Sequence, residues 1–193
     1  MRGRYAAALL GVALILAGCG TDVQGAQTTS VTAAVQAGET FNDTDVMYLQ
    51  MMVAHHEQGL QMVRIAEKSG KRAEIKTLAK AVDVTQADEV KLIKGWLQGW
   101  SKPVTVDHDP SLHTAHGGLP ATGPEEMAAL RKAKGSAFDA TFLNLFVAHQ
   151  HNAVEMAAME RSGGANAEAK AFAERVRESR ADQIKQMLNL LNS

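Results

Sequence analysis

One segment of this chain occurs twice. Residues 47–62 align without a gap on residues 141–156, and the offset is 94 positions throughout. Both copies keep Val-Ala-His, a small residue four positions after that His, and a Met seven positions after it. A chance match is not expected to preserve histidine and methionine among mostly apolar positions. The repeat therefore predicts a duplicated element that carries His and Met on one side.

Apolar residues recur with helical spacing through most of the chain. This periodicity predicts four long helices over about residues 42–69, 72–98, 136–162 and 166–191, and a shorter one over 122–134. Asn42, Asp43 or Thr44 can cap the first long helix, and Asn166 can cap the fourth. Ser136 and Asp139 have the spacing of a capping box for the third.

The repeat extends into the second helix of each copy, because Leu78 matches Phe172 and Val82 matches Val176 at the same offset. Each unit is therefore a helical hairpin, and two hairpins predict an all-α, ferritin-like four-helix bundle. The Pro- and Gly-rich stretch over residues 101–121 is long enough to cross the length of such a bundle. A simple up-down-up-down order stays open.

The first residues have the pattern of an export signal. Arg2 and Arg4 precede a short apolar run, and Leu16-Ala17-Gly18-Cys19 resembles a lipoprotein cleavage box. An apolar run this short favours a signal peptide over a transmembrane helix. We expect residues 1–18 to be removed and Cys19 to carry a lipid anchor, in the cell envelope or on the outer face of the cytoplasmic membrane. A plain secretory signal with an incidental Cys is the alternative.

The remaining chain is long enough for one domain. Residues 19–41 are typical of a flexible tether. We expect residues 42–193 to form the bundle, with a first repeat over 42–100, a connection over 101–135 and a second repeat over 136–193.

Composition limits the partners. Cys19 is the only cysteine, so packing and not disulfide bonds must hold the fold together. Removal of Arg2 and Arg4 with the signal changes the net charge from −1 to −3, which leaves no basic patch for nucleic acid.

His and Met fall on one face of each repeated helix. An α-helix turns about 100° per residue, so a residue seven positions along returns to nearly the same side. His55 and Met62 therefore lie on one line, and so do His149 and Met156. The two equivalent stripes consist of Met52, His55, His56, Gly59 and Met62, and of Phe146, His149, Gln150, Ala153 and Met156.

The donor atoms on this face favour copper. Imidazole nitrogen binds late first-row metals, and the soft thioether sulfur suits Cu(I) above all, with Cu(II) as the second option. Thiolates bind copper more tightly but oxidise outside the cytoplasm, so a His/Met site fits an exported protein. The predicted metal ligands are Met52, His55, His56, Met62, His149 and Met156.

Three further histidines are candidates by spacing. His151 lies about 200° around the helix from His149, so a solvated pair with Glu155 explains it as well as a ligand role does. His113 and His116 have the His-x-x-His spacing of a chelating pair, and a polar loop that happens to contain histidines is the alternative.

Two other functions stay open. Methionines at helical spacing also fill cores, which would make the protein a non-metal helical interaction module of the cell envelope. A copper ion with an open coordination position would make it an oxidoreductase. The chain contains no Glu-x-x-His motif of a carboxylate-bridged di-iron bundle and no nucleophile motif, so binding is favoured over catalysis.

These motifs resemble those of a known bacterial family. Met52-x-x-His55-His56-x-x-Gly59-x-x-Met62, the second helix ending in Ile93-Lys94-Gly95-Trp96-Leu97, and the second copy together resemble domain-of-unknown-function family 305. The resemblance covers roughly residues 43–191. It implies a ferritin-like helical bundle, often secreted or lipid-anchored, with some members associated with copper binding and copper resistance.

The resemblance also implies a set of ligands, namely His55, His56, Met62, His149 and Met156. The chain departs from the family in one place, because the second copy has His149-Gln150-His151 where the family usually has His-His. Gln150 is a poor copper ligand, so the second half is expected to contribute fewer ligands than the first.

Overall fold

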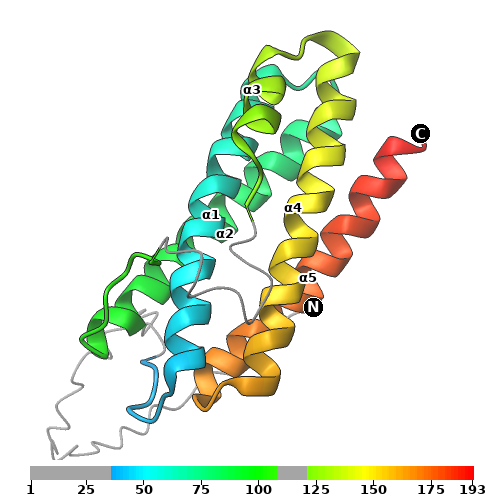
Figure 1. The fold of residues 1–193 in the computed structure, drawn as a ribbon. Coiled ribbons are helices and arrows are strands. Elements are labelled where there is room, and N and C mark those ends of the chain that lie inside the picture. The colour runs from blue at the N-terminus through cyan, green and yellow to red at the C-terminus, as the bar shows by residue number, and fades with distance from the viewer. Residues whose placement is uncertain (1–35, 108–120) are drawn as a thin grey trace, which may run out of the picture. The chain divides into compact units, whose positions relative to one another are not determined.

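The structure of the chain is a computed structural model that describes residues 36–107 and 121–193. Every regular element in these ranges is an α-helix, which confirms the all-α class. The helices are α1 (Asp43–Ser69), α2 (Ala73–Gly99), α3 (Pro124–Lys132), α4 (Gly135–Gly163) and α5 (Ala167–Leu191) (Figure 1). The four long helices begin and end within one residue of their predicted bounds.

Asn42 is the cap of α1 among its three candidates, and the predicted cap of α5 is confirmed. The Asn42 side chain accepts a hydrogen bond from Asp45 N at 3.0 Å, and Asp45 Oδ2 accepts one from Asn42 N at 2.6 Å, which completes a capping box. The Asn166 side chain accepts a hydrogen bond from Ala169 N at 2.9 Å. Local sequence therefore sets both helix starts.

The capping box predicted for α4 is wrong. Its N-cap residue is Lys134, whose side chain makes no cap hydrogen bond. Asp139 instead accepts hydrogen bonds from the backbone N–H groups of Lys71 (2.9 Å) and Arg72 (3.1 Å), just before α2. The carboxylate satisfies donors that a helix start leaves free, and it ties the two hairpins together.

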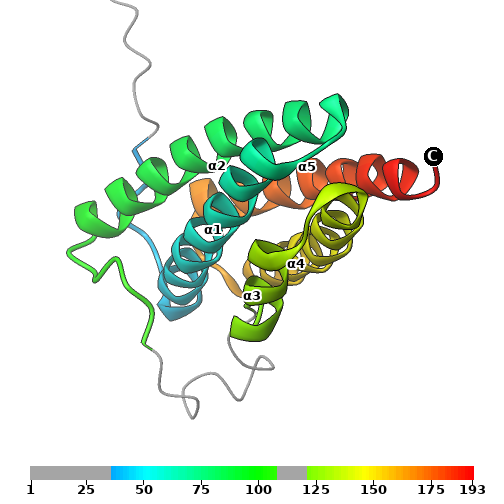
Figure 2. The ribbon, with the colours of Figure 1, turned by 90° about the horizontal axis from the view of Figure 1, so that it is seen from above.

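The two hairpins pack through their first helices. α1 pairs with α2, α4 pairs with α5, and α1 contacts α4. Figure 1 shows that α1 ends at the end of the bundle where α4 begins, so the two repeated helices are antiparallel. Figure 2 shows them side by side, with α2 beside α1 and α5 beside α4.

The connection between the hairpins crosses the length of the bundle. The chain leaves α2 at one end and enters α4 at the opposite end (Figure 1). α3 lies within this connection and packs on α4 and α1. The crossover order is therefore observed, and the up-down-up-down order is not.

Two apolar clusters fill the bundle, and a polar layer separates them. One cluster includes Met52, Met156 and Trp96, and the other includes Met62 and Phe146. On each long helix, buried polar side chains lie between the stretches that supply the two clusters. They are His55 and His56 in α1, Gln86 in α2, His149 and Gln150 in α4, and Arg180 in α5.

Candidate metal centre

His55 of α1 and His149 of α4 meet in the polar layer. Both are buried, and their rings stack with centroids 3.7 Å apart and planes inclined by 12°. His55 Nε2 lies 2.9 Å from the backbone carbonyl oxygen of His149. Because α1 and α4 are antiparallel copies of one sequence, the duplication brings its own two histidines face to face.

Each of these rings keeps one nitrogen without a hydrogen-bond partner. A carbonyl oxygen only accepts, so His55 Nε2 carries the hydrogen and Nδ1 carries the lone pair. Among the described residues, neither His55 Nδ1 nor His149 Nε2 has a partner. Burying a polar atom without a partner costs free energy, and a bound metal ion would remove that cost.

Thr122 completes the surroundings of His149. Its Oγ1 lies 3.3 Å from His149 Nδ1 and donates to Met62 Sδ at 3.6 Å. The hydroxyl has a single hydrogen, so in the arrangement in which it donates to sulfur it accepts from His149 Nδ1–H. His149 Nε2 then carries the lone pair.

Burial keeps these imidazoles neutral. Desolvation lowers the pKa of His55 well below its usual range, and the neighbouring His149 and His56 lower it further. Desolvation also lowers the pKa of His149 to about 3, and it lowers the pKa of His56. A metal ion competes with protons for imidazole nitrogen, so neutral rings are ready to act as ligands at neutral pH.

The methionines are distributed unequally around the histidine pair. Antiparallel packing places Met156, which follows His149 in its helix, in the same apolar cluster as Met52, which precedes His55. The other cluster pairs Met62 with Phe146, the residue that stands at the position of Met52 in the second copy. One side of the pair therefore offers two thioethers from the repeat, and the other side offers one.

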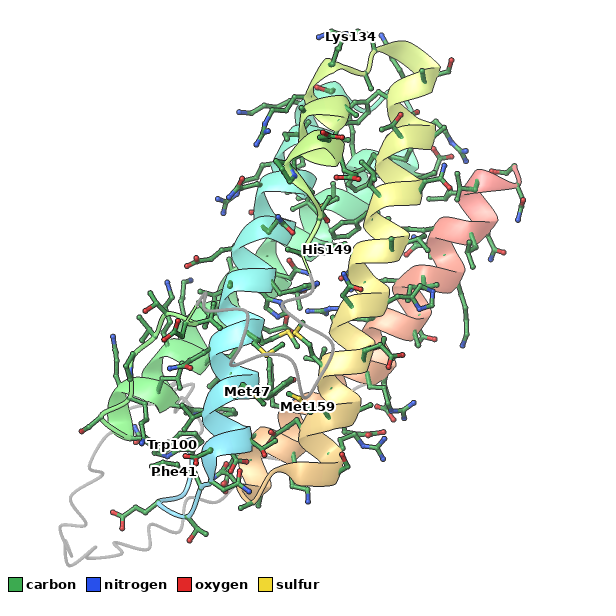
Figure 3. All side chains as sticks on the ribbon, in the orientation of Figure 1. Phe41, Met47, Trp100, Lys134, His149 and Met159 are labelled. Carbon is green, nitrogen blue, oxygen red and sulfur yellow. The ribbon has the colours of Figure 1, made fainter. Side chains whose placement is uncertain are left out.

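The thioether-rich side extends toward the surface. Figure 3 shows sulfur atoms between α1 and α4, on the side of His149 where Met47 and Met159 lie. Met47 and Met159 are partly buried and pack on the same cluster. Five methionines thus belong to this side of the histidine pair, namely Met47, Met51, Met52, Met156 and Met159.

Gly59 allows close approach at the centre. A Cβ atom on Gly59 would lie 2.9 Å from His149 Nε2 and closer than 3.0 Å to Gln86 Oε1. Real Cβ atoms essentially never come so close to a neighbour. The small residue thus provides the space into which two side chains from other helices reach.

His56 has different partners from His55. Its Nε2 lies 2.9 Å from Glu89 Oε2 of α2, and Arg180 of α5 forms an ion pair with the same carboxylate oxygen. Sequence reasoning missed Glu89 and Arg180. A signal was present, because Arg180 stands between Val176 and Ile184 in the apolar stripe of α5, where a charge needs a partner.

The other predicted residues lie away from this centre or outside the described residues. His151 is exposed on α4, as its rotation from His149 predicts. Gln150 is buried and donates to Gln183 of α5, while its Oε1 has no partner among the residues described. Cys19, His113 and His116 lie outside the ranges that the structure describes.

The geometry limits how a metal ion could bind. Within residues 36–107 and 121–193, no group of three or more His, Cys, Asp or Glu side chains is arranged to hold a metal ion. The other candidate donors near the pair are the thioether sulfurs of Met52, Met156 and Met62. An imidazole lone pair lies in the ring plane, so the nearly parallel His55 and His149 rings do not direct their lone pairs at one point. One ring has to rotate before both bind the same ion.

The fold and this centre define an all-α bundle with a buried imidazole–thioether core. The sequence model of the family described as domain of unknown function DUF305 matches residues 45–191, and the chain belongs to this family. The comparison with curated proteins finds no match.

Solved structures of the family have the same fold. A predicted secreted DUF305 protein from Streptomyces coelicolor is 27% identical, with a TM-score of 0.72 over 77% of this chain and 92% of that chain. CopM in its Cu(I)-bound form is 26% identical, with a TM-score of 0.66 over 78% of this chain and 97% of that chain. Cu(II)-bound and Ag-bound forms of CopM match as well.

The described part of the chain contains no helix that is both long and apolar enough to cross a membrane.

Proposed function

We propose that this protein binds copper through imidazole and thioether groups in the middle of the bundle, and that it buffers the ion or hands it on. One observation carries the proposal. Two stacked, buried histidines each keep a ring nitrogen without a partner among the described residues, and methionine sulfurs lie on both sides of them.

The donor set favours Cu(I). Thioether sulfur is a poor ligand for hard cations and a good one for Cu(I), and imidazole accepts both Cu(I) and Cu(II). His55 and His149 supply imidazoles, and Met52 and Met156 lie on the thioether-rich side of them. His56 and Met62 complete the proposed set. The similarity to CopM, which has Cu(I)-, Cu(II)- and Ag-bound forms, supports a copper ion.

We place this function outside the cytoplasm. The sequence features of residues 1–18 and Cys19 support export and a lipid anchor, and the similarity to a predicted secreted protein supports export. A thiol-free centre is suited to an oxidising compartment, because methionine and histidine do not form disulfides.

A competition titration tests the copper site. The purified mature chain is titrated with Cu(I) against a chelator of known affinity. The double variant His55→Ala/His149→Ala is expected to raise the Kd by about 100-fold or more, since the loss of groups that only orient ligands already costs about 10–100-fold. His151→Ala is the matched control, because His151 lies on α4 but is exposed, and its Kd should not change. An unchanged Kd in the double variant would refute the proposal.

A thermal melt separates this function from that of a non-metal interaction module. A ligand at 100 times its Kd stabilises the native state by about 2.7 kcal/mol, which corresponds to a rise in Tm of about 5–10 °C for a domain of this size. A Tm that stays constant in excess Cu(I) would favour the interaction module.

A further inference from the structure

A buried ionic network joins three helices next to the proposed copper centre. Glu89 Oε2 of α2 lies 2.9 Å from His56 Nε2 of α1 and forms an ion pair with Arg180 of α5. The side chains of His56 and Arg180 are fully buried, and that of Glu89 is 17% exposed. A charge in such a position is retained only if it is paired, so the guanidinium and the carboxylate depend on each other.

This network determines which nitrogen of His56 carries the hydrogen. A carboxylate only accepts hydrogen bonds, so the contact with Glu89 requires the hydrogen on His56 Nε2. Arg180 Nη2 lies 3.4 Å from the same nitrogen and also donates to Glu89, so the two donors share one oxygen. His56 Nδ1 therefore carries the lone pair, and it has no partner among the described residues.

The repeat generates an uncharged counterpart of the same network. At the repeat offset of 94 positions, His56, Glu89 and Gln86 correspond to Gln150, Gln183 and Arg180. Gln150 and Gln183 are hydrogen-bonded, as His56 and Glu89 are. Gln86, which stands where Arg180 stands in the second copy, is fully buried, and neither of its amide atoms has a partner in the described ranges.

We propose that Glu89 and Arg180 are positioning residues, which hold His56 with its Nδ1 lone pair free and thereby make the first half of the duplicated centre its main metal-binding half. The counterpart network, Gln150 and Gln183 of the second repeat with Gln86 of the first, contains no ionisable group, and an amide at Gln150 cannot replace an imidazole as a ligand. A carboxylate that fixes the tautomer of a ligand histidine also increases the basicity of that ligand. This inference rests on the proposed copper function.

Two measurements on the same variants test the inference. The double variant Glu89→Gln/Arg180→Gln removes both charges together and recreates the amide composition of the second half, so no unpaired charge remains. The long-range ¹H–¹⁵N spectrum of the metal-free protein reports the tautomer of each histidine, and His56→Gln identifies the signal of His56. Competition titration then gives the Kd for Cu(I). Gln183→Asn is the matched control, because it perturbs the equivalent position in the other half.

We expect wild-type His56 to carry its hydrogen on Nε2, and the double variant to lose this single tautomer and to bind Cu(I) about 10–100-fold more weakly. Gln183→Asn should preserve both the tautomer of His56 and the Kd. A double variant with the wild-type tautomer and Kd would overturn the inference. A wild-type protein that does not bind Cu(I) would instead overturn the copper function itself.

Discussion

Replacement of Gly59 by alanine tests whether the centre depends on close approach between helices. In a helix interior, alanine is more favourable than glycine by about 0.8–1.0 kcal/mol, so an unobstructed site gains stability from this change. At Gly59 the new methyl group would come closer than 3.0 Å to two buried atoms, Gln86 Oε1 and His149 Nε2. Overpacking of this kind costs about 1–3 kcal/mol. The net effect is a loss of about 0–2 kcal/mol.

Gly95→Ala is the matched control. Gly95 lies inside α2, and a Cβ added there meets no atom within 4 Å. Gly95→Ala should therefore raise the free energy of unfolding by about 0.8–1.0 kcal/mol. In urea unfolding, the free energies of the two variants should differ by about 1–3 kcal/mol. For a domain of this size that difference corresponds to about 2–12 °C in Tm.

The Gly59→Ala variant should also bind Cu(I) more weakly, because the methyl group occupies the space in front of His149 Nε2. Gly95→Ala should bind as the wild type does. If both variants gain the same stability and keep the same Kd, the space at Gly59 has no role in the centre and the reasoning is refuted.

Three further predictions concern stability. Burial and the neighbouring Asp45 raise the pKa of Glu160 to about 8. The folded chain thus keeps this proton, whereas the unfolded chain releases it near pH 4.5, so the free energy of unfolding should fall between pH 4.5 and 8. Urea titrations at pH 5 and pH 8 measure this fall, and Glu160→Gln should remove most of it. Asn166→Ala should lower the free energy of unfolding by about 1–2 kcal/mol, because the Asn166 side chain caps α5 and donates to two backbone carbonyl groups before α1. A loss below about 0.5 kcal/mol would contradict this. Glu89→Gln and Arg180→Gln should each lower the free energy of unfolding by about 3–5 kcal/mol, because each leaves the other charge buried without its partner. The double variant should lose less than the sum of the two single variants, and additive losses would show that the two side chains are not coupled.

The prediction from sequence succeeded where the physical cause is local. Helical periodicity and the caps at Asn42 and Asn166 act over a few residues, so the helix bounds could be predicted closely. The rotation of His151 away from His149 follows from helix geometry alone. The capping box at Ser136 failed because Asp139 satisfies donors of another hairpin, which no local pattern reveals.

The candidate centre was predicted in part for the same reason. The stripe identified His55, His149 and the small residue Gly59, because all of them follow the repeat. It did not identify Glu89 or Arg180, because these lie on the second helices of the hairpins, and their link to His56 depends on how the two hairpins come together.

The sequence by itself determined that the chain is a duplicated helical hairpin with His and Met on the inner face of each first helix. Only the tertiary structure decided that α1 and α4 run antiparallel, which stacks His55 on His149 and gathers Met52 with Met156. The physical reason is the separation along the sequence of the residues that come into contact. Turns and caps involve neighbours, whereas the His55–His149 contact joins residues 94 positions apart and the Glu89–Arg180 pair joins residues 91 positions apart. Such contacts depend on the direction in which the connection crosses the bundle.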